Sequence, residues 1–237
     1  MDLKIKDVAD LLSVSETTIR RWLAEGKIPA YRIHHQYRFS RIEIEDWVMS
    51  CRLKRKKGSF LPATEEGGEE EERAGNQQFS LFRSLHHGDV LHDIQSVDKE
   101  GIIKETVSRI AGILSLDAEV LAELLLDRER LMPTGLNNGI AVPHTRDFLL
   151  EGQKDVVVAV FPKEPIEWGS LDKEPVHTLF FLFASNDKRH LHLLAKLAHL
   201  ASHEEALSLF KGRPEKKGLL EMVRDWEAGG CSAPAHA

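Results

Sequence analysis

Hydrophobic and polar positions follow a helical period at the start of the chain. Val8, Leu11 and Leu12 have the i, i+3, i+4 spacing of a short amphipathic helix. Ser15 is a good N-cap for a second helix, which is predicted to run to about residue 25. Gly26 follows that run and ends the helix, since glycine is favoured just beyond a helix C-terminus.

The period then changes to that of strands. The segments AYRI and YRFS alternate and predict a small hairpin around residues 34–36, and IEIEDW opens a third helix. Two short helices, a tight turn and a basic hairpin predict a winged helix-turn-helix. At about 100° per residue, Ile19 and Trp22 share the inner face of the second helix, whereas Thr17 and Arg21 point outward.

Outward hydroxyl and guanidinium groups suit a DNA groove, where arginine commonly reads guanine. Two arginines on a helix more often only contact solvent. The complete pattern of two short helices, a tight turn and a basic hairpin nevertheless favours DNA binding. The predicted DNA contacts are Thr17, Thr18, Arg20 and Arg21 in the major groove, and Arg32, His34, Gln36 and Arg38 on phosphates or in a minor groove.

From Phe79 onward, helical and strand-like segments alternate. Residues 98–114 and 117–131 read as amphipathic helices, and another helix begins at about Lys188. GIAVPH, DVVVAVF and HTLFFLF read as strands, the last two apolar enough to be buried. The predicted fold class is α/β: a small N-terminal winged helix-turn-helix domain and a larger α/β domain with a mixed sheet flanked by helices.

Charge divides the 237 residues in the same way. The total is −6, but residues 1–58 carry about +5 and residues 59–78 about −5. We therefore predict a DNA-binding domain over 1–57, an acidic flexible linker over 58–78, a second domain over 79–227 and a disordered tail over 228–237. The run Glu69 to Glu72 is interpreted as a solvated spacer, with competition against DNA as the alternative.

Composition and cysteine spacing indicate the cellular compartment and whether a metal site is expected. No apolar run approaches the ~20 residues of a membrane helix, and the start lacks the apolar core of a signal peptide. Cys51 and Cys231 have no metal-ligand spacing. We expect a cytoplasmic protein with no membrane insertion, no cofactor and no metal.

One histidine stands in an unusual setting, in the stretch TGLNNGIAVPHTRD. His144 lies at the carboxyl end of a predicted strand, where α/β folds place reactive groups. Pro143 fixes the backbone beside it, and Gly135 and Gly139 permit close backbone approach. A neutral imidazole is a good phosphoryl acceptor near pH 7.

The helix in RHLHLLAKLAHLASH carries four more histidines. The stripe of His192, His199 and His203 with Lys196 is predicted to be a solvated face rather than a metal site. His190 turns inward at the helix N-terminus, where backbone N–H groups favour anions. We predict that His190 donates a hydrogen bond to a phosphoryl group on His144.

The first 50 residues resemble a known DNA-binding family. The run DVADLLSVSETTIRRWLAEGKIPAYRI…YRFSRIEIEDW is similar to the excisionase or MerR-like helix-turn-helix domain, over about Leu3 to Val48. The resemblance implies binding to double-stranded DNA. MerR-type effector regions are absent, and one such module makes few phosphate contacts, so a homodimer or a helper protein is expected.

The remainder resembles a second family. LLLDRERLMPTGLNNGIAVPHTR and PVHTLFFLFAS…RHLHLLAKLAHL are similar to the type-2 (fructose/mannitol/nitrogen-type) enzyme IIA domain of the bacterial phosphoenolpyruvate-dependent phosphotransferase system. The resemblance covers about Phe79 to Arg224. It implies that His144 accepts a phosphoryl group from an HPr-like phosphohistidine carrier, with Arg128 and Thr134 holding the charge. The Met132-Pro133 pair departs from the pattern.

Three functions are consistent with these features. The leading hypothesis is a DNA-binding regulator whose state depends on phosphorylation of His144. The alternative is a phosphocarrier IIA component of a sugar phosphotransferase system that passes phosphate to a separate IIB domain or permease. A recombination directionality factor would explain the N-terminal domain only. In each phosphotransfer hypothesis the chain is a phosphoryl-transfer component rather than a free-standing catalyst.

Overall fold

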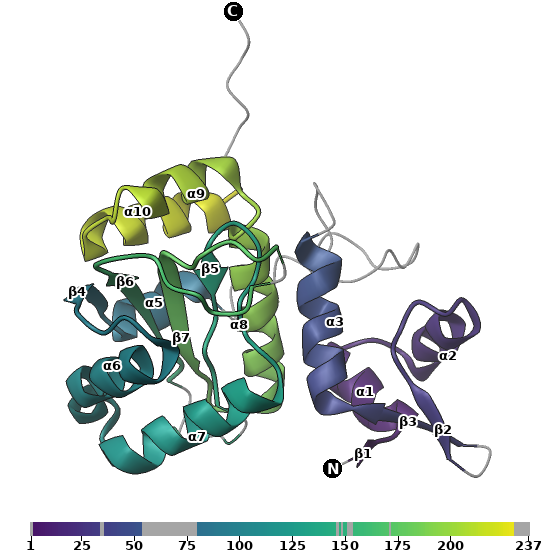
Figure 1. The fold of residues 1–237 in the computed structure, drawn as a ribbon. Helices are drawn as coiled ribbons and strands as arrows, with labels where there is room; N and C mark the ends of the chain where they lie inside the picture. The colour runs from purple at the N-terminus through teal and green to yellow at the C-terminus, as the bar shows by residue number, and fades with distance from the viewer. Residues whose placement is uncertain are drawn as a thin grey trace, which may run out of the picture.

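The computed structural model of the protein describes residues 2–33, 36–53, 80–145, 147, 149–150, 154–170 and 172–229. They form two packed units: an N-terminal domain, residues 2–53, and a body, residues 80–229 (Figure 1). The predicted linker, and the tail beyond residue 229, lie outside the described residues. Within the described part of the chain, no helix combines the length and apolarity needed to cross a membrane.

The N-terminal domain has the predicted winged helix-turn-helix architecture. A small antiparallel sheet of order β1-β3-β2 packs beside three helices. Its elements are β1 (Asp2–Leu3), α1 (Ile5–Leu12), α2 (Glu16–Ala24), β2 (Tyr31–Ile33), β3 (Gln36–Ser40) and α3 (Arg41–Leu53).

Local sequence explains the ends of these helices. The Ser15 side chain accepts a hydrogen bond from the Thr18 backbone N–H and caps α2, as predicted. Gly26 follows the end of α2 with φ +64°, a conformation that glycine adopts without strain. Ile19 and Trp22 are buried in the core of the domain, so the predicted inner face is confirmed.

The body is an α/β fold of three layers. Its elements are α5 (Leu81–His87), β4 (Val90–Ile94), α6 (Lys99–Leu114), α7 (Ala118–Leu131), β5 (Ile140–Ala141), β6 (Val156–Pro162), β7 (Thr178–Phe183), α8 (Asp187–Leu200), α9 (Glu204–Lys211) and α10 (Lys216–Glu227). The mixed sheet has the order β4-β6-β7-β5, in which β6 and β7 are antiparallel and the two outer pairs are parallel.

Both central strands are buried on both faces. Alternate side chains of β6 point to opposite sides: Val157 and Ala159 pack with α5, α8, α9 and α10, whereas Val158 and Val160 pack with α6 and α7. Because each face is covered by helices, the strand is apolar at every position. The sequence therefore predicted a buried strand correctly.

Helix α8 belongs to two hydrophobic cores. Leu193 and Leu197 pack against the sheet of the body, whereas Leu191 and Ala195 join the core of the N-terminal domain. In the opposite sense, Met49 of α3 packs into the core of the body. Figure 1 shows α3 lying along α8, with α2 and the β2–β3 wing on the far side of the N-terminal domain. The two domains are therefore joined by apolar packing.

Candidate active site

The backbone around His144 is held from both sides. Val142 N–H donates to the Thr134 carbonyl at 3.0 Å, and Leu182 N–H donates to the Pro143 carbonyl at 2.9 Å. His144 itself pairs in parallel with Leu182, three residues beyond the short strand β5. The histidine therefore stands at the carboxyl end of a strand, as predicted.

Two glycines make this arrangement sterically possible. A Cβ at Gly135 would lie 2.7 Å from the Ser170 Cα. Gly139 has φ +70°, and a Cβ there would lie 2.5 Å from the ring of His177. Both positions require a residue without a side chain, so the prediction of close backbone approach is confirmed.

The two nitrogens of the His144 ring have different partners. Nδ1 lies 2.8 Å from the Val142 carbonyl oxygen, which can only accept a hydrogen bond, so Nδ1 carries the proton. Nε2 then has the lone pair, and it accepts a hydrogen bond from Arg128 Nε at 3.0 Å. The ring is thus held in one tautomer, with its nucleophilic nitrogen directed at a cationic group.

Arg128 projects from the last turn of α7 and is buried. Its Nη1 donates to the Met132 carbonyl at 2.9 Å, which fixes the guanidinium beside His144. Its Nη2 makes no hydrogen bond within the described residues and lies 3.9 Å from carboxylate oxygens of Glu45 and Asp46. A buried cationic donor of this kind is suited to an anion.

His190 comes from the first turn of α8, which Asn186 caps. Its ring meets the ring of His144 edge-on, with centroids 5.0 Å apart, so the structure brings the two predicted histidines together. Burial lowers the pKa of His190 to about 3, although the charge of Glu45 opposes this shift. His190 is therefore neutral at pH 7.

Glu45 and Asp46, from α3 of the N-terminal domain, also enter the site. Glu45 Oε2 lies 3.7 Å from His144 Nε2, and Glu45 Oε1 lies 3.6 Å from His190 Nε2. Burial would raise the pKa of Glu45, but the pKa is held below its usual range; the hydrogen bond that Arg41 Nε donates to Glu45 Oε1 at 2.9 Å lowers it whatever the protonation of the two histidines. Glu45 is thus an ionised carboxylate.

Sequence reasoning missed Glu45. One signal in the sequence could have indicated that Glu45 is buried. Glu45 stands beside Ile44 and one turn before Met49, so it places a carboxylate on an otherwise apolar side of α3. Nothing in the periodicity of one domain shows which surface of the other domain it meets.

Thr134 is buried, and its hydroxyl contacts two other side chains of the body. It donates to Glu129 Oε2 at 2.6 Å and accepts from Trp168 Nε1 at 3.2 Å. Glu129 also accepts from the Thr134 backbone N–H and pairs with Lys99 at 3.0 Å. These contacts indicate that Thr134 organises the loop before His144; the expectation that Thr134 helps to hold the charge of a phosphoryl group stays a prediction.

The predicted solvated histidine stripe on α8 is wrong. Lys196 is buried and pairs with Glu227 of α10 at 2.7 Å, and the ring of His199 packs edge-on against Trp226. Lys196 and His199 therefore face α10. A 3.6-residue period shows which residues share a face but not what covers that face.

Among the described residues, one group could offer metal ligands. It is formed by Glu45, His144 and His190, the residues of the site around His144. Their ligand atoms lie within 4.8 Å of one another. However, Arg128 donates to the same His144 nitrogen that a metal would need, and its positive charge would repel a cation. The electrostatics of the group therefore favour an anion.

Most predicted DNA-contacting side chains are exposed. Thr17, Arg20 and Arg21 of α2 are open to solvent, as are Arg32 and Gln36 at the wing. Arg38 is half-buried and donates to Gln36, and the hydroxyl of the half-buried Thr18 lies 3.0 Å from that of the capping Ser15. Thr18 therefore contributes to the helix start and is a poorer candidate for base contact than predicted. His34 lies outside the described residues.

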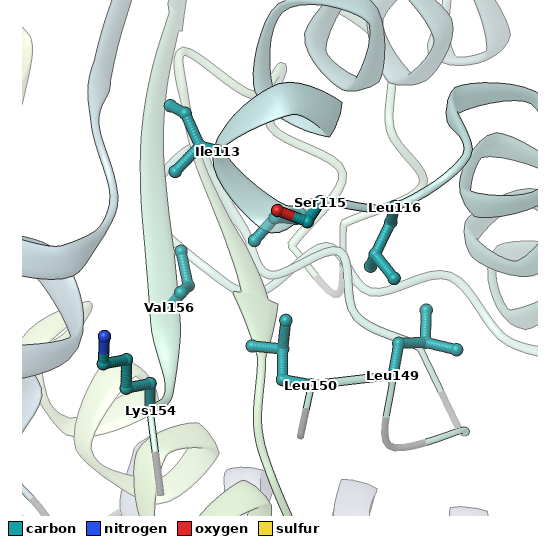
Figure 2. Close-up of a pocket in the computed structure, with 8 residues that line it drawn as sticks. Ile113, Ser115, Leu116, Leu149, Leu150, Lys154 and Val156 are labelled. Carbon is teal, nitrogen blue, oxygen red and sulfur yellow. The ribbon is translucent and has the colours of Figure 1, made fainter. Parts of the chain in front are cut away.

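A pocket of about 410 Å³ lies beside the end of α6 and the start of β6 (Figure 2). Apolar side chains from the end of α6, the segment 149–150 and the start of β6 line it, with Lys154 at one edge. None of its lining residues belongs to the group around His144.

Comparison with known proteins agrees with this geometry. Residues 83–225 match the family "Phosphoenolpyruvate-dependent sugar phosphotransferase system, EIIA 2", and residues 3–52 match a helix-turn-helix domain. The chain is 30% identical over 153 residues to a nitrogen regulatory protein of Pseudomonas aeruginosa, covering 63% of this chain and 97% of the relative. It is 33% identical over 128 residues to a nitrogen regulatory protein of Escherichia coli, covering 52% and 77%.

A solved structure gives the same result. The crystal structure of the nitrogen regulatory protein IIA-Ntr from Neisseria meningitidis matches with 26% identity and a TM-score of 0.52, covering 59% of this chain and 94% of that one. The buried histidine pair thus lies within the matched region of the body. The chain belongs to the EIIA 2 family of the phosphoenolpyruvate-dependent sugar phosphotransferase system, with a helix-turn-helix domain at its N-terminus.

Proposed function

We propose that this chain is a DNA-binding regulatory protein whose body accepts a phosphoryl group on His144 from the phosphohistidine of an HPr-like carrier. The observation that supports the acceptor role is the fixed tautomer of His144. Its proton is on Nδ1, bonded to the Val142 carbonyl, so Nε2 carries the lone pair; the Arg128 hydrogen bond that this lone pair accepts must pass to the phosphoryl oxygens as Nε2 attacks.

In the proposed step, the Nε2 lone pair attacks the phosphorus atom of the donor. The N–P bond of the donor breaks as the new N–P bond forms, and the donor imidazole leaves with the electron pair. Arg128 lies beside Nε2 and supplies charge-assisted hydrogen bonds to the phosphoryl oxygens. His190, neutral at pH 7, donates one more hydrogen bond from its N–H. Thr134 supports this group through the loop that it shares with Glu129.

The regulatory role is supported by the N-terminal domain. Thr17, Arg20 and Arg21 form an exposed polar face on α2, the second helix of the helix-turn-helix. Relatives that share the body are named nitrogen regulatory proteins. We therefore infer that double-stranded DNA is one partner and an HPr-like carrier the other, that the protein acts in the cytoplasm, and that a homodimer binds DNA.

The alternative is a phosphocarrier that serves a sugar permease. A fructose-specific EIIABC component of Bacillus subtilis is 32% identical over 135 residues, which is 21% of its length. In this function His144 would pass its phosphoryl group to a separate IIB domain, and DNA would have no effect. Transfer from the labelled chain to an added IIB domain distinguishes the two functions.

The test of the acceptor role is phosphotransfer from labelled phosphoenolpyruvate through enzyme I and an HPr protein. His144→Ala should abolish acid-labile labelling of the full chain. His190→Ala should still accept phosphate, but more slowly or with a less stable product, because it loses only a hydrogen-bond donor. Undiminished labelling of His144→Ala would exclude the assignment.

A further inference from the structure

We propose that the N-terminal domain is an internal ligand of the acceptor surface: the Glu45 carboxylate occupies the position of the phosphoryl group, and the domain competes with the phosphoryl donor for the face of the body around His144. This inference rests on the acceptor role proposed above for His144. The surface around His144 would then bind the N-terminal domain as well as the phosphoryl donor. Docking of the domain and phosphorylation of His144 would exclude each other.

The first observation is the placement of Glu45. Its carboxylate oxygens lie 3.7 Å from His144 Nε2, the atom that would carry the phosphoryl group. They also lie 3.6 Å from His190 Nε2 and 3.9 Å from Arg128 Nη2, the groups that would contact its oxygens. The Glu45 side chain is 1% exposed. All three contacts have ion-pair distances rather than hydrogen-bond distances, and Glu45 Oε2 and Arg128 Nη2 have no hydrogen-bond partner within the described residues. The carboxylate thus places a negative charge beside Arg128, where the site would hold an oxyanion.

The second observation is the surface around it. Met49 of α3 packs into the core of the body, and Leu191 and Ala195 of α8 pack into the core of the N-terminal domain. An ion pair between Arg41 and Asp187 lies at the edge. Glu45 is therefore held by an apolar interface, and the side chain of His144 is fully buried beneath it.

A phosphoryl donor cannot reach His144 in this arrangement. In-line attack requires the donor phosphorus to approach Nε2 to bonding distance, in the space where Glu45 lies. The N-terminal domain must separate from α8 before transfer. Once His144 carries a phosphoryl group with nearly two negative charges, Glu45 and Asp46 would be buried against a like charge. Phosphorylation therefore opposes return of the domain.

The DNA-binding face is open in the docked state. Thr17, Arg20 and Arg21 are exposed, and Figure 1 shows α2 on the side of the domain away from α8. Docking thus does not cover this face. Phosphorylation changes how the face is attached, from rigid packing on the body to a connection through the chain alone.

The competing occupant of the site is a divalent metal held by Glu45, His144 and His190. The hydrogen bond from Arg128 to His144 Nε2 argues against it. Titration with zinc separates the two: tight binding of one zinc ion by the wild-type chain, lost in Glu45→Gln with phosphotransfer rates unaltered, would overturn the proposal.

The kinetic test uses the full chain and the phosphotransfer assay. Glu45→Gln removes the charge without changing the size of the side chain, so the open population should rise and phosphorylation should accelerate by at least about tenfold. Glu43→Gln is the matched control, because Glu43 is an exposed carboxylate on the same helix. Met49→Ala weakens the apolar contact instead and should also accelerate transfer. Equal rates for wild type, Glu45→Gln and Met49→Ala would overturn the proposal.

A second measurement detects docking directly. With methyl-labelled methionine, the Met49 signal reports the interface, and Met222 on α10 is an internal reference. Phosphorylation of the wild type, and Glu45→Gln without phosphate, should move the Met49 signal toward that of a solvent-exposed methyl group. Phosphate uptake with an unchanged Met49 signal would refute the proposal but leave the acceptor role intact. The opposite outcome is a shift of the Met49 signal in Glu45→Gln while no variant is labelled on His144. That outcome would refute the acceptor role but would support docking of the N-terminal domain.

Discussion

Asp46 makes the stability of the docked protein depend on pH, and Asp46→Asn tests this dependence. The side chain is 24% exposed, its Oδ2 has no hydrogen-bond partner within the described residues, and its Oδ1 lies 3.9 Å from Arg128 Nη2. Burial raises the pKa of Asp46 from 3.8 to about 6, against the charge of Arg128, which lowers it. The ionised form is therefore disfavoured in the folded protein.

The magnitude follows from the difference between the two pKa values. A group whose folded pKa is raised contributes stability that is complete below its unfolded pKa, 3.8, and is lost as pH rises through about 6. The shift corresponds to an upper limit of about 3 kcal/mol at 1.36 kcal/mol per unit. Since a quarter of the side chain contacts water, we expect about 1–2 kcal/mol.

Asparagine cannot ionise, so Asp46→Asn should be more stable than wild type at pH 7 by that amount, and the difference should shrink as pH falls to 4. The assay is urea unfolding of both proteins at several pH values between 4 and 7.5. Glu43→Gln removes one charge at an exposed position of α3 and should leave the difference unaltered. The low pKa of His190 affects all these proteins alike and cancels in the comparison. Parallel profiles for wild type and Asp46→Asn would show that the reasoning is wrong.

Three further changes test other parts of the molecule. Arg21→Ala in the full chain should weaken specific DNA binding by about 1–3 kcal/mol and relax base preference, if the exposed side chain reads guanine; unchanged binding to selected duplexes would place it off the interface. Glu129→Gln should lower the free energy of unfolding by about 1–2 kcal/mol, because the half-exposed Lys99 loses its charged partner and Thr134 loses a charged acceptor; a change below 0.5 kcal/mol, the scale of a surface substitution, would contradict this. Glu227→Ala should lower the thermal midpoint, since its carboxylate accepts hydrogen bonds from the start of α5 and from Lys196; Glu221→Ala, an exposed carboxylate on the same helix, is the control, and equal midpoints would exclude the role.

The long regular elements could be predicted from the sequence. Helices α6 and α7 begin one residue after the aspartates that cap them, and β6, and β7 after Thr178, are apolar because helices cover both faces. Strand β4 and helices α5, α9 and α10 were not predicted, because each is short or covers the core with only a few apolar positions.

The candidate site was predictable only in part. His144, His190 and Arg128 are brought together as the motif indicated. Glu45 was missed, and the contact between Thr134 and Trp168 was not predicted, because both depend on partners distant in the sequence. Periodicity describes the faces of one element, whereas these contacts depend on how whole domains meet.

The shared position of α8 has a consequence for synthesis of the chain. The N-terminal domain leaves the ribosome first, but Leu191 and Ala195, which complete its core, follow roughly 140 residues later. At roughly 5–20 residues per second, α3 remains without its partner for on the order of 7–30 s. During this interval Met49 is an uncovered apolar side chain, and the nascent chain must avoid association through it. Completion of α8 is therefore the step after which the N-terminal domain can reach its final packing.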